Sequence, residues 1–139
     1  MNYLLIGRPN VGKSSIYNIL TGSNSNIIHK DSGTTRDWHK AKIFLTTDHY
    51  IYDTPGTILD SNKKNNIKST NLLDKLLSEI DVFIFVIDYK PVHNPFDKEA
   101  IKSLRRYNKK ILLIINKVDN LNNEISYDKY KYGINDIFL

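Results

Sequence analysis

Three runs of mostly apolar residues mark the pattern of hydrophobic and polar positions along this chain. They are NYLLI at residues 2–6, VFIFVI at 82–87 and ILLII at 111–115. Runs of this length without alternating polar positions are typical of strands buried on both faces, as in a parallel sheet. We therefore predict three central strands that are covered on both sides of the sheet.

The segments between these strands show shorter β patterns and helical periodicity. AKIFLTT at 41–47 and HYIYD at 49–53 flank Asp48 and predict a β-hairpin. Helices are predicted over residues 13–20, 71–80 and 96–107. In the second of them, the apolar residues all fall on one face: Leu72, Leu73, Leu76, Leu77 and Ile80. The alternation of strands and helices predicts an α/β fold with a mostly parallel sheet flanked by helices.

The last apolar run, INDIFL at 134–139, predicts one more buried strand. A parallel strand of this architecture needs a helix against its face, and no residue follows Leu139 in the sequence. We therefore expect a single domain over residues 1–139 that is interrupted after its last strand and lacks its last helix.

The composition limits the class of protein and its compartment. The longest apolar run has six residues, VFIFVI, where a membrane-spanning helix needs about 20, so we expect no membrane segment. The chain has no cysteine, which excludes disulfides and thiolate metal sites and favours the cytoplasm. Its net charge of +5 suits a polyanion such as ribosomal RNA, and we expect no DNA partner. A general excess of lysine and asparagine explains this charge equally well.

The residues GRPNVGKSS lie between the first predicted strand and the first predicted helix. They match the pattern G-x-x-x-x-G-K-[ST], in which glycines let backbone N–H groups turn inward around phosphate oxygens. In this pattern Lys13 contacts the β- and γ-phosphates and the Ser14 hydroxyl ligates Mg²⁺. An ordinary strand-to-helix loop is the alternative. The predicted nucleotide contacts in this segment are Gly7, Arg8, Pro9, Asn10, Val11, Gly12, Lys13, Ser14 and Ser15.

The sequence DTPG follows the second strand of the predicted hairpin. A carboxylate at a strand end that faces the phosphate loop, such as that of Asp53, can hold Mg²⁺ through a water molecule. We expect the backbone N–H of Gly56 to meet a γ-phosphate. The predicted contacts here are Asp53, Thr54, Pro55 and Gly56, although the same four residues also make a good ordinary turn.

The sequence NKVD directly follows the third predicted central strand and comprises Asn116, Lys117, Val118 and Asp119. Guanine presents two N–H donors on one edge, which a single carboxylate such as that of Asp119 accepts together, whereas adenine lacks this pair. Charge-assisted hydrogen bonds of about 1.5–3 kcal/mol each are sufficient to select one purine. The Lys117 stem is long enough to lie over the base. An N-cap at the start of a helix is the alternative interpretation.

A fourth motif, GTTRD at residues 33–37, lies in a polar stretch. A threonine here can complete a Mg²⁺ shell only while a γ-phosphate is present, which makes a switch. Spacing alone does not separate Thr34 from Thr35. Each of the four motifs has an ordinary explanation, but together and in this order they predict a domain that binds GTP or GDP with Mg²⁺.

These motifs resemble those of the translation-factor-related GTPases, most closely the Der (EngA) family of ribosome-assembly GTPases. IGRPNVGKSS, GTTRD, DTPG and NKVD cover the whole chain at that family's spacing. The resemblance implies a G domain that hydrolyses GTP during large-subunit assembly and lacks its last guanine-binding loop. It also implies that pre-ribosomal particles or ribosomal RNA bind through other regions of the protein. Era-type GTPases, which act on the small subunit, share GRPNVGKS and DTPG and are the nearest alternative; a nucleotide-gated binding module with little hydrolysis is another.

The resemblance also assigns the catalytic roles. It selects Thr35 as the Mg²⁺-ligating threonine, beside Ser14 and Asp53, and adds Lys13 to the catalytic residues. Thr57 stands where Ras-type GTPases place a glutamine, and it is too short to orient water in the same way. The resemblance instead implies K⁺ bound by Asn10 beside the phosphates, and a hydrogen bond that stiffens the loop is the alternative for this side chain.

Overall fold

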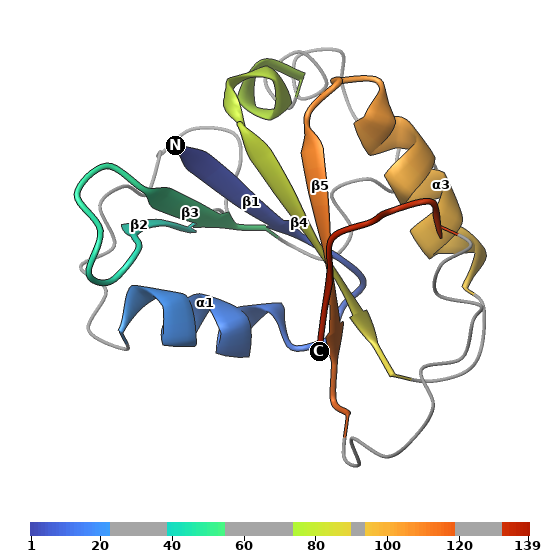
Figure 1. Ribbon diagram of the computed structural model, residues 1–139, viewed down its shortest axis with the longest axis horizontal. Helices are drawn as coiled ribbons and strands as arrows, with labels where there is room; N and C mark the ends of the chain where they lie inside the picture. The colour runs from blue at the N-terminus through green and yellow to red at the C-terminus, as the bar shows by residue number, and fades with distance from the viewer. Residues whose placement is uncertain (23–38, 55–73, 90–93, 119–131) are drawn as a thin grey trace.

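We describe the fold from a computed structural model of the chain, shown in Figure 1. The described residues are 1–22, 39–54, 74–89, 94–118 and 132–139. All structural statements below concern these parts of the chain.

Six strands form one sheet, in the spatial order β2-β3-β1-β4-β5-β6. The strands are β1 (Asn2–Ile6), β2 (His39–Lys42), β3 (Tyr50–Asp53), β4 (Val82–Asp88), β5 (Lys110–Asn116) and β6 (Ile137–Phe138). Every neighbouring pair is parallel except β2 and β3, which are antiparallel. The three predicted central strands and the mostly parallel sheet are therefore confirmed, and the predicted last strand is present over two residues.

The predicted hairpin is present, but its first strand is shorter at one end and longer at the other. β2 begins at His39 and ends at Lys42, whereas the pattern placed this strand over 41–47. The chain leaves the ladder because Leu45 takes a positive φ of 60°. The backbone N–H and the hydroxyl of Thr46 both donate to the Ile43 carbonyl oxygen, at 3.2 and 2.7 Å, and so close a turn. The prediction that residues 43–47 continue the strand is wrong for this reason.

Two helices with defined bounds pack on the sheet, α1 (Lys13–Thr21) and α3 (Pro95–Arg105), and residues 74–79 are also helical. α3 begins where its sequence predicts a helix start: the Asn94 side chain accepts a hydrogen bond from the Phe96 N–H at 3.0 Å, and Pro95 occupies the first turn. It ends at Arg105, two residues earlier than predicted. In the described residues, no helix has the length and apolar character needed to cross a membrane.

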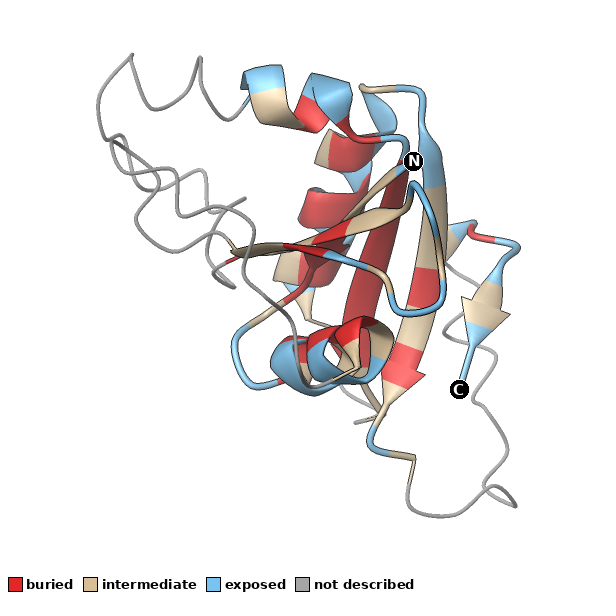
Figure 2. Ribbon diagram, turned by 90° about the vertical axis from the view of Figure 1, so that its left-hand side faces the viewer, coloured by how far each residue is buried: buried red, intermediate tan, exposed pale blue. Residues whose placement is uncertain are grey.

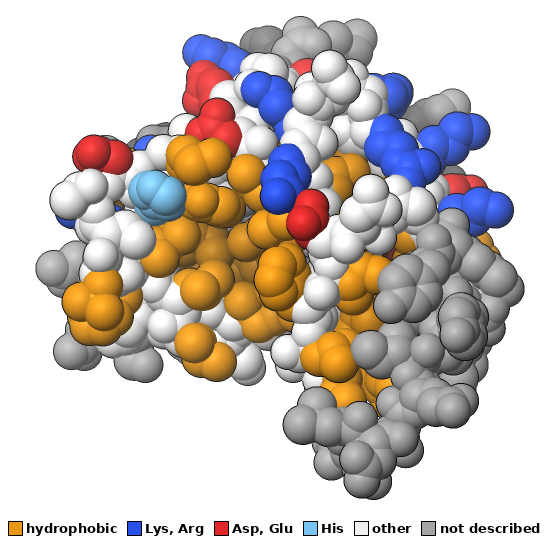
Figure 3. Space-filling view, viewed as in Figure 1, with side chains coloured by type: hydrophobic (Ala, Val, Ile, Leu, Met, Phe, Trp, Pro, Cys, Tyr) orange, Lys and Arg blue, Asp and Glu red, His pale blue; other side chains and the backbone are white. Residues whose placement is uncertain are grey.

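Buried apolar side chains form one cluster on each face of the sheet, because alternate residues of β1, β4 and β5 point to opposite sides. One cluster joins these strands to α3 and to the helical residues 74–79; its members include Leu77, Phe83, Phe85, Ile101 and Leu104. The other lies beneath α1; its members include Leu5, Tyr17, Ile51, Ile84 and Val86. Figure 2 shows the buried positions concentrated in the central strands. Figure 3 shows hydrophobic side chains gathered in the middle of one face of the molecule. Tyr3, Leu112 and Ile114 pack against the α1-side cluster and are only partly buried.

The parallel strands bring four polar chain segments to one edge of the sheet. The carboxyl ends of β1, β3, β4 and β5 lie together, and they lead into Gly7, Thr54, Tyr89 and Lys117. In open α/β sheets ligands bind at this edge. Three of the four sequence motifs therefore meet at one place.

Candidate functional site

The phosphate loop, residues 7–12 between β1 and α1, runs so close to two strands that two of its positions must be glycine. A Cβ atom on Gly7 would lie 2.3 Å from the Val86 carbonyl oxygen in β4. A Cβ atom on Gly12 would lie 2.0 Å from Nδ2 of Asn116, and Gly12 also has a φ of 99°, which side chains rarely allow. The two glycines of the motif therefore let the loop curl against the ends of β4 and β5.

Lys13 is the first residue of α1 and is only 7% exposed. Its Nζ atom donates hydrogen bonds to the carbonyl oxygens of Gly7 at 3.0 Å and Arg8 at 2.8 Å, so the ammonium lies within the curve of the loop. Burial lowers the pKa of Lys13, and the nearby Asp53 carboxylate opposes that shift. The start of α1 has no side-chain cap and no acidic residue in its first turn. The helix end and the ammonium therefore present positive charge to the same space.

Asp53, the last residue of β3, pairs with Ser14 of α1. The Ser14 hydroxyl lies 3.5 Å from Oδ2 of Asp53, while Oδ1 is buried and has no hydrogen-bond partner in the described residues. Burial raises the pKa of Asp53, opposed mainly by the charge of Lys13. A hydroxyl beside a carboxylate with an unpaired oxygen is an oxygen donor set that suits Mg²⁺. The residues present fit the predicted metal site.

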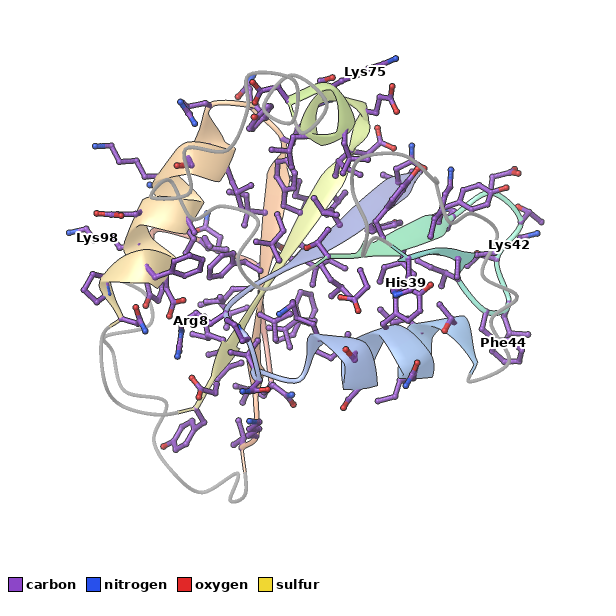
Figure 4. All side chains as sticks on the ribbon, turned by 180° about the vertical axis from the view of Figure 1, so that it is seen from behind. Arg8, His39, Lys42, Phe44, Lys75 and Lys98 are labelled. Carbon is purple, nitrogen blue, oxygen red and sulfur yellow. The ribbon has the colours of Figure 1, made fainter. Side chains whose placement is uncertain are left out.

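Two other polar groups near Asp53 are also buried without a hydrogen-bond partner in the described residues, the Tyr17 hydroxyl and Nδ1 of His39. His39 is the ladder partner of Asp53, and Figure 4 shows it between the sheet and α1. Burial raises the pKa of Tyr17, and the Asp53 carboxylate raises it further. The sequence patterns assigned the histidines no role, because no pair of them has metal-ligand spacing.

Asn116 and Lys117 join the end of β5 to the phosphate loop. Nδ2 of Asn116 donates to the Val11 carbonyl oxygen at 2.9 Å, and Nζ of Lys117 donates to the Asn10 carbonyl oxygen at 2.5 Å. Lys117 takes a φ of 62°, a conformation that turns the chain sharply after the strand. Two motifs more than 100 residues apart are thus in direct contact.

The Arg8 side chain binds carboxylates of two elements that are distant in the sequence, α3 and β4. Its Nε lies 3.0 Å and 3.3 Å from the two carboxylate oxygens of Asp97 in α3, and one terminal nitrogen lies 2.7 Å from Oδ1 of Asp88 at the end of β4. Neither aspartate belongs to one of the four sequence motifs, so neither was predicted. The position of Asp88 directly after a buried strand was the available signal, because that is where the other site residues occur.

The other predicted residues of the motifs differ in their surroundings. Thr54 is buried, and its hydroxyl donates to the Leu5 carbonyl oxygen at 2.9 Å, which ties β3 to β1. Pro9 and Ser15 are exposed, and Val118 packs on the α3-side core. Four predicted residues lie outside the described parts of the chain: Thr35, Pro55, Gly56 and Asp119.

The raised pKa of Asp53 predicts how this carboxylate affects stability. The folded state binds the Asp53 proton more readily than the unfolded state, so its contribution to stability falls as pH rises from the ordinary value of 3.8 to the raised pKa. At pH 7, without nucleotide or Mg²⁺, we therefore expect Asp53→Asn to have a larger free energy of unfolding than the wild type. Urea unfolding followed by circular dichroism measures this difference, which should disappear in acid below pH 3.8.

Asp48→Asn, on the exposed hairpin turn, controls for removal of a carboxylate elsewhere. Mg²⁺ with GDP should stabilise the wild type and leave Asp53→Asn much less affected. An Asp53→Asn protein that is less stable than wild type at pH 7 would contradict the argument from burial.

Comparison with known proteins gives three kinds of match. The family described as 50S ribosome-binding GTPase matches residues 2–117. GTPase Der of Aquifex aeolicus is 35% identical over 137 residues, which cover 97% of this chain and 32% of that protein. The structure of a variant of Era from Aquifex aeolicus bound to GDP·AlF4⁻ has a TM-score of 0.70 and 28% identity, and the match covers 99% of this chain and 49% of that one. Era in complex with MgGDPNP and nucleotides 1506–1542 of 16S ribosomal RNA matches with a TM-score of 0.70 and 27% identity, over the same shares of the two chains.

These matches confirm the predicted resemblance to Der and the predicted α/β fold of a phosphate-loop GTPase, with Era among the structural neighbours. The chain spans about a third of the length of the Der protein that it matches.

Proposed function

This chain belongs to the family of 50S ribosome-binding GTPases, and we propose that it binds GTP and GDP and hydrolyses GTP to GDP and phosphate. One observation carries the proposal: Asn116 and Lys117 donate hydrogen bonds to the backbone of the phosphate loop. The segment expected to bind guanine is thereby held against the loop expected to bind phosphates. A single nucleotide has the length to reach both segments.

The phosphates of the nucleotide lie, in this proposal, in the curve of the loop above the start of α1. The N–H groups of the first turn of α1 and of the loop donate to phosphate oxygens, and the Lys13 ammonium contacts the β- and γ-phosphates. Because Lys13 is buried, water screens its charge less than on the surface. The chain thus supplies fixed positive charge where negative charge develops during phosphoryl transfer.

Ser14 and Asp53 hold Mg²⁺ in this proposal, Ser14 by direct ligation and Asp53 through water. When bound, Mg²⁺ neutralises charge on the β- and γ-phosphate oxygens. We assign Thr35 as a further ligand that engages only when a γ-phosphate is present. The GTTRD segment then responds to hydrolysis, as switch segments do.

Asn10 is proposed to hold K⁺ beside the phosphates and so to supply charge that an arginine supplies in other GTPases. Its backbone already takes a positive φ of 64°, and its carbonyl oxygen is bound by Lys117. We expect single-turnover GTP hydrolysis to be about tenfold or more faster in K⁺ than in Na⁺, and Asn10→Ala to remove this difference. Release of phosphate measures both rates, which should be slow without an activator, about 10⁻⁴–10⁻² s⁻¹.

Matched salts at equal ionic strength isolate the identity of the cation in this experiment. Equal rates in the two salts would remove Asn10 from the catalytic residues. Binding of GTP without hydrolysis in either salt would instead favour a nucleotide-gated binding module.

We propose that this activity serves assembly of the large ribosomal subunit. The similarity to GTPase Der and the family description support this role. The similarity to Era bound to 16S ribosomal RNA supports the alternative, maturation of the small subunit. Co-sedimentation of the protein with purified large and small subunits in the presence of GDPNP separates the two.

A further inference from the structure

We propose that Asp97 of α3 is a positioning residue for the phosphate loop and that it acts through Arg8. The inference rests on the proposed binding of a guanine nucleotide and adds a residue that lies outside all four motifs. Among the predicted nucleotide contacts that the structure describes, the Arg8 side chain is the one that binds Asp97.

The Arg8 guanidinium is held by carboxylates from two different elements. Asp97 receives its Nε at 3.0 Å and 3.3 Å, and Asp88 receives a terminal nitrogen at 2.7 Å. The Asp97 side chain is only 3% exposed, and that of Arg8 is 24% exposed. Figure 4 shows Arg8 beside the first turn of α3. Because the Asp97 carboxylate is buried, removal of Arg8 would leave its charge without a compensating partner, which is costly. Removal of Asp97 would leave Arg8 held by Asp88 alone.

The element that carries Asp97 is itself firmly placed. Ala100, Ile101 and Leu104 of α3 are buried in the core, and Asn94 caps the helix start. At the other end of α3, Arg105 donates to the carbonyl oxygens of Tyr132 and Gly133. Asp97 is therefore a fixed point, and Arg8 is the loop residue that is held against it.

The backbone of Arg8 connects this ion pair to the nucleotide-binding machinery. The Arg8 carbonyl oxygen accepts a hydrogen bond from Nζ of Lys13 at 2.8 Å. The bonds from β5 hold Asn10 and Val11, in the second half of the loop. Among the described residues, the first half is held by the side-chain contacts of Arg8 and by the Lys13 ammonium, which donates to the Gly7 and Arg8 carbonyl oxygens. A change in where Arg8 lies thus moves both the loop backbone and an acceptor of the Lys13 ammonium.

Charge alone predicts the opposite effect of Asp97, and this difference in sign makes the inference testable. Asp97 adds a negative charge near a site for a polyanion, so its neutralisation should tighten nucleotide binding if only electrostatics mattered. If Asp97 positions the loop, its neutralisation leaves Arg8 held only by Asp88 at the end of β4, and binding weakens. The direction of the change separates the two effects.

The first measurement is the Kd of a fluorescent GDP analogue in the presence of Mg²⁺ for the wild type and Asp97→Asn. We expect Asp97→Asn to bind about tenfold more weakly, by analogy with the loss seen when residues that orient metal ligands are changed. Glu99→Gln, which removes a charge from the exposed side of the same helix, should stay within about twofold of the wild type. Unchanged or tighter binding by Asp97→Asn would overturn the inference.

Arg8→Met gives the second measurement, a double-mutant cycle. Asp97→Asn should weaken binding in the wild-type background and have no weakening effect when Arg8 is already absent. The same factor in both backgrounds would show that Asp97 does not act through Arg8. Each Kd is measured under conditions in which the variant is fully folded, so a loss of stability alone does not change it. Urea unfolding of each variant measures the loss of stability separately and so identifies a merely structural role.

Arg8→Lys keeps the positive charge but replaces the planar guanidinium and its several N–H donors by a single ammonium. This variant replaces Asp97→Asn in the test if Asp97→Asn does not fold. It too should weaken GDP binding, and an affinity equal to wild type would contradict the inference. A wild-type protein that does not bind GDP would contradict the proposed function itself, whereas equal affinities of wild type and Asp97→Asn contradict the role of Asp97 alone.

Discussion

Lys13→Ala is expected to bind GDP and GTP about 10²–10⁴-fold more weakly than the wild type. In the proposed site, the ammonium makes two charge-assisted hydrogen bonds to phosphates, each of about 1.5–3 kcal/mol, and 1.4 kcal/mol corresponds to a factor of ten. The side chain is buried within the curve of the loop, where no other described lysine lies within hydrogen-bond distance of the loop's first half. Isothermal titration with each nucleotide in Mg²⁺ measures the loss.

Lys75→Ala is the matched control for this variant. Lys75 is exposed on the helical residues 74–79, and Figure 4 shows it far from Arg8 and the phosphate loop. The control should keep the wild-type affinity, and circular dichroism should show both variants folded. A folded Lys13→Ala protein with an affinity within about threefold of wild type would exclude the assigned role of the lysine.

Asp119→Asn is expected to lose affinity for GDP by about 10²–10⁴-fold and to gain affinity for xanthosine diphosphate. A carboxylate accepts from the two N–H groups of guanine, whereas an amide pairs with the carbonyl oxygen that xanthine carries in place of the 2-amino group. Asp119 follows two residues after Lys117, which is bound to the loop backbone at Asn10. Displacement of a fluorescent nucleotide analogue by GDP and by xanthosine diphosphate measures the affinity of the variant for each.

The gain for the xanthine nucleotide serves as the internal control, because a misfolded variant loses affinity for every nucleotide and gains none. A variant that binds neither base better than wild type, while remaining folded, would contradict the guanine assignment. One that still prefers GDP would show that another residue reads the base.

The central strands could be predicted because burial on both faces leaves a direct trace in the sequence. VFIFVI became β4 with alternate residues in the two cores, Phe83 and Phe85 on one side and Ile84 and Val86 on the other. The end of β2 could not be predicted, since Phe44 and Leu45 continue an apolar pattern although both are exposed. A single positive φ at Leu45 and a turn closed by Thr46 decide where the strand stops.

The site could be predicted where the spacing of residues within a motif fixes their positions in the loop. Gly12 and Lys13 stand at fixed spacing, and the structure explains Gly12 by the approach of Asn116. The pairing of Arg8 with Asp97 was not predictable, because the two residues are 89 positions apart. Asp97 also has an ordinary local explanation, an acidic residue in the first turn of a helix. Only the fold shows that its side chain points to the phosphate loop.

The most direct test of the account is a calorimetric titration of the wild-type protein with GDP and, separately, with ADP, in the presence of Mg²⁺. The contact between the β5 end and the phosphate loop predicts one GDP site with a Kd at or below about 10 μM, and ADP binding at least about 100-fold weaker. No heat with GDP at millimolar concentration, or equal affinities for the two nucleotides, would contradict the claim that these segments form one guanine-nucleotide site.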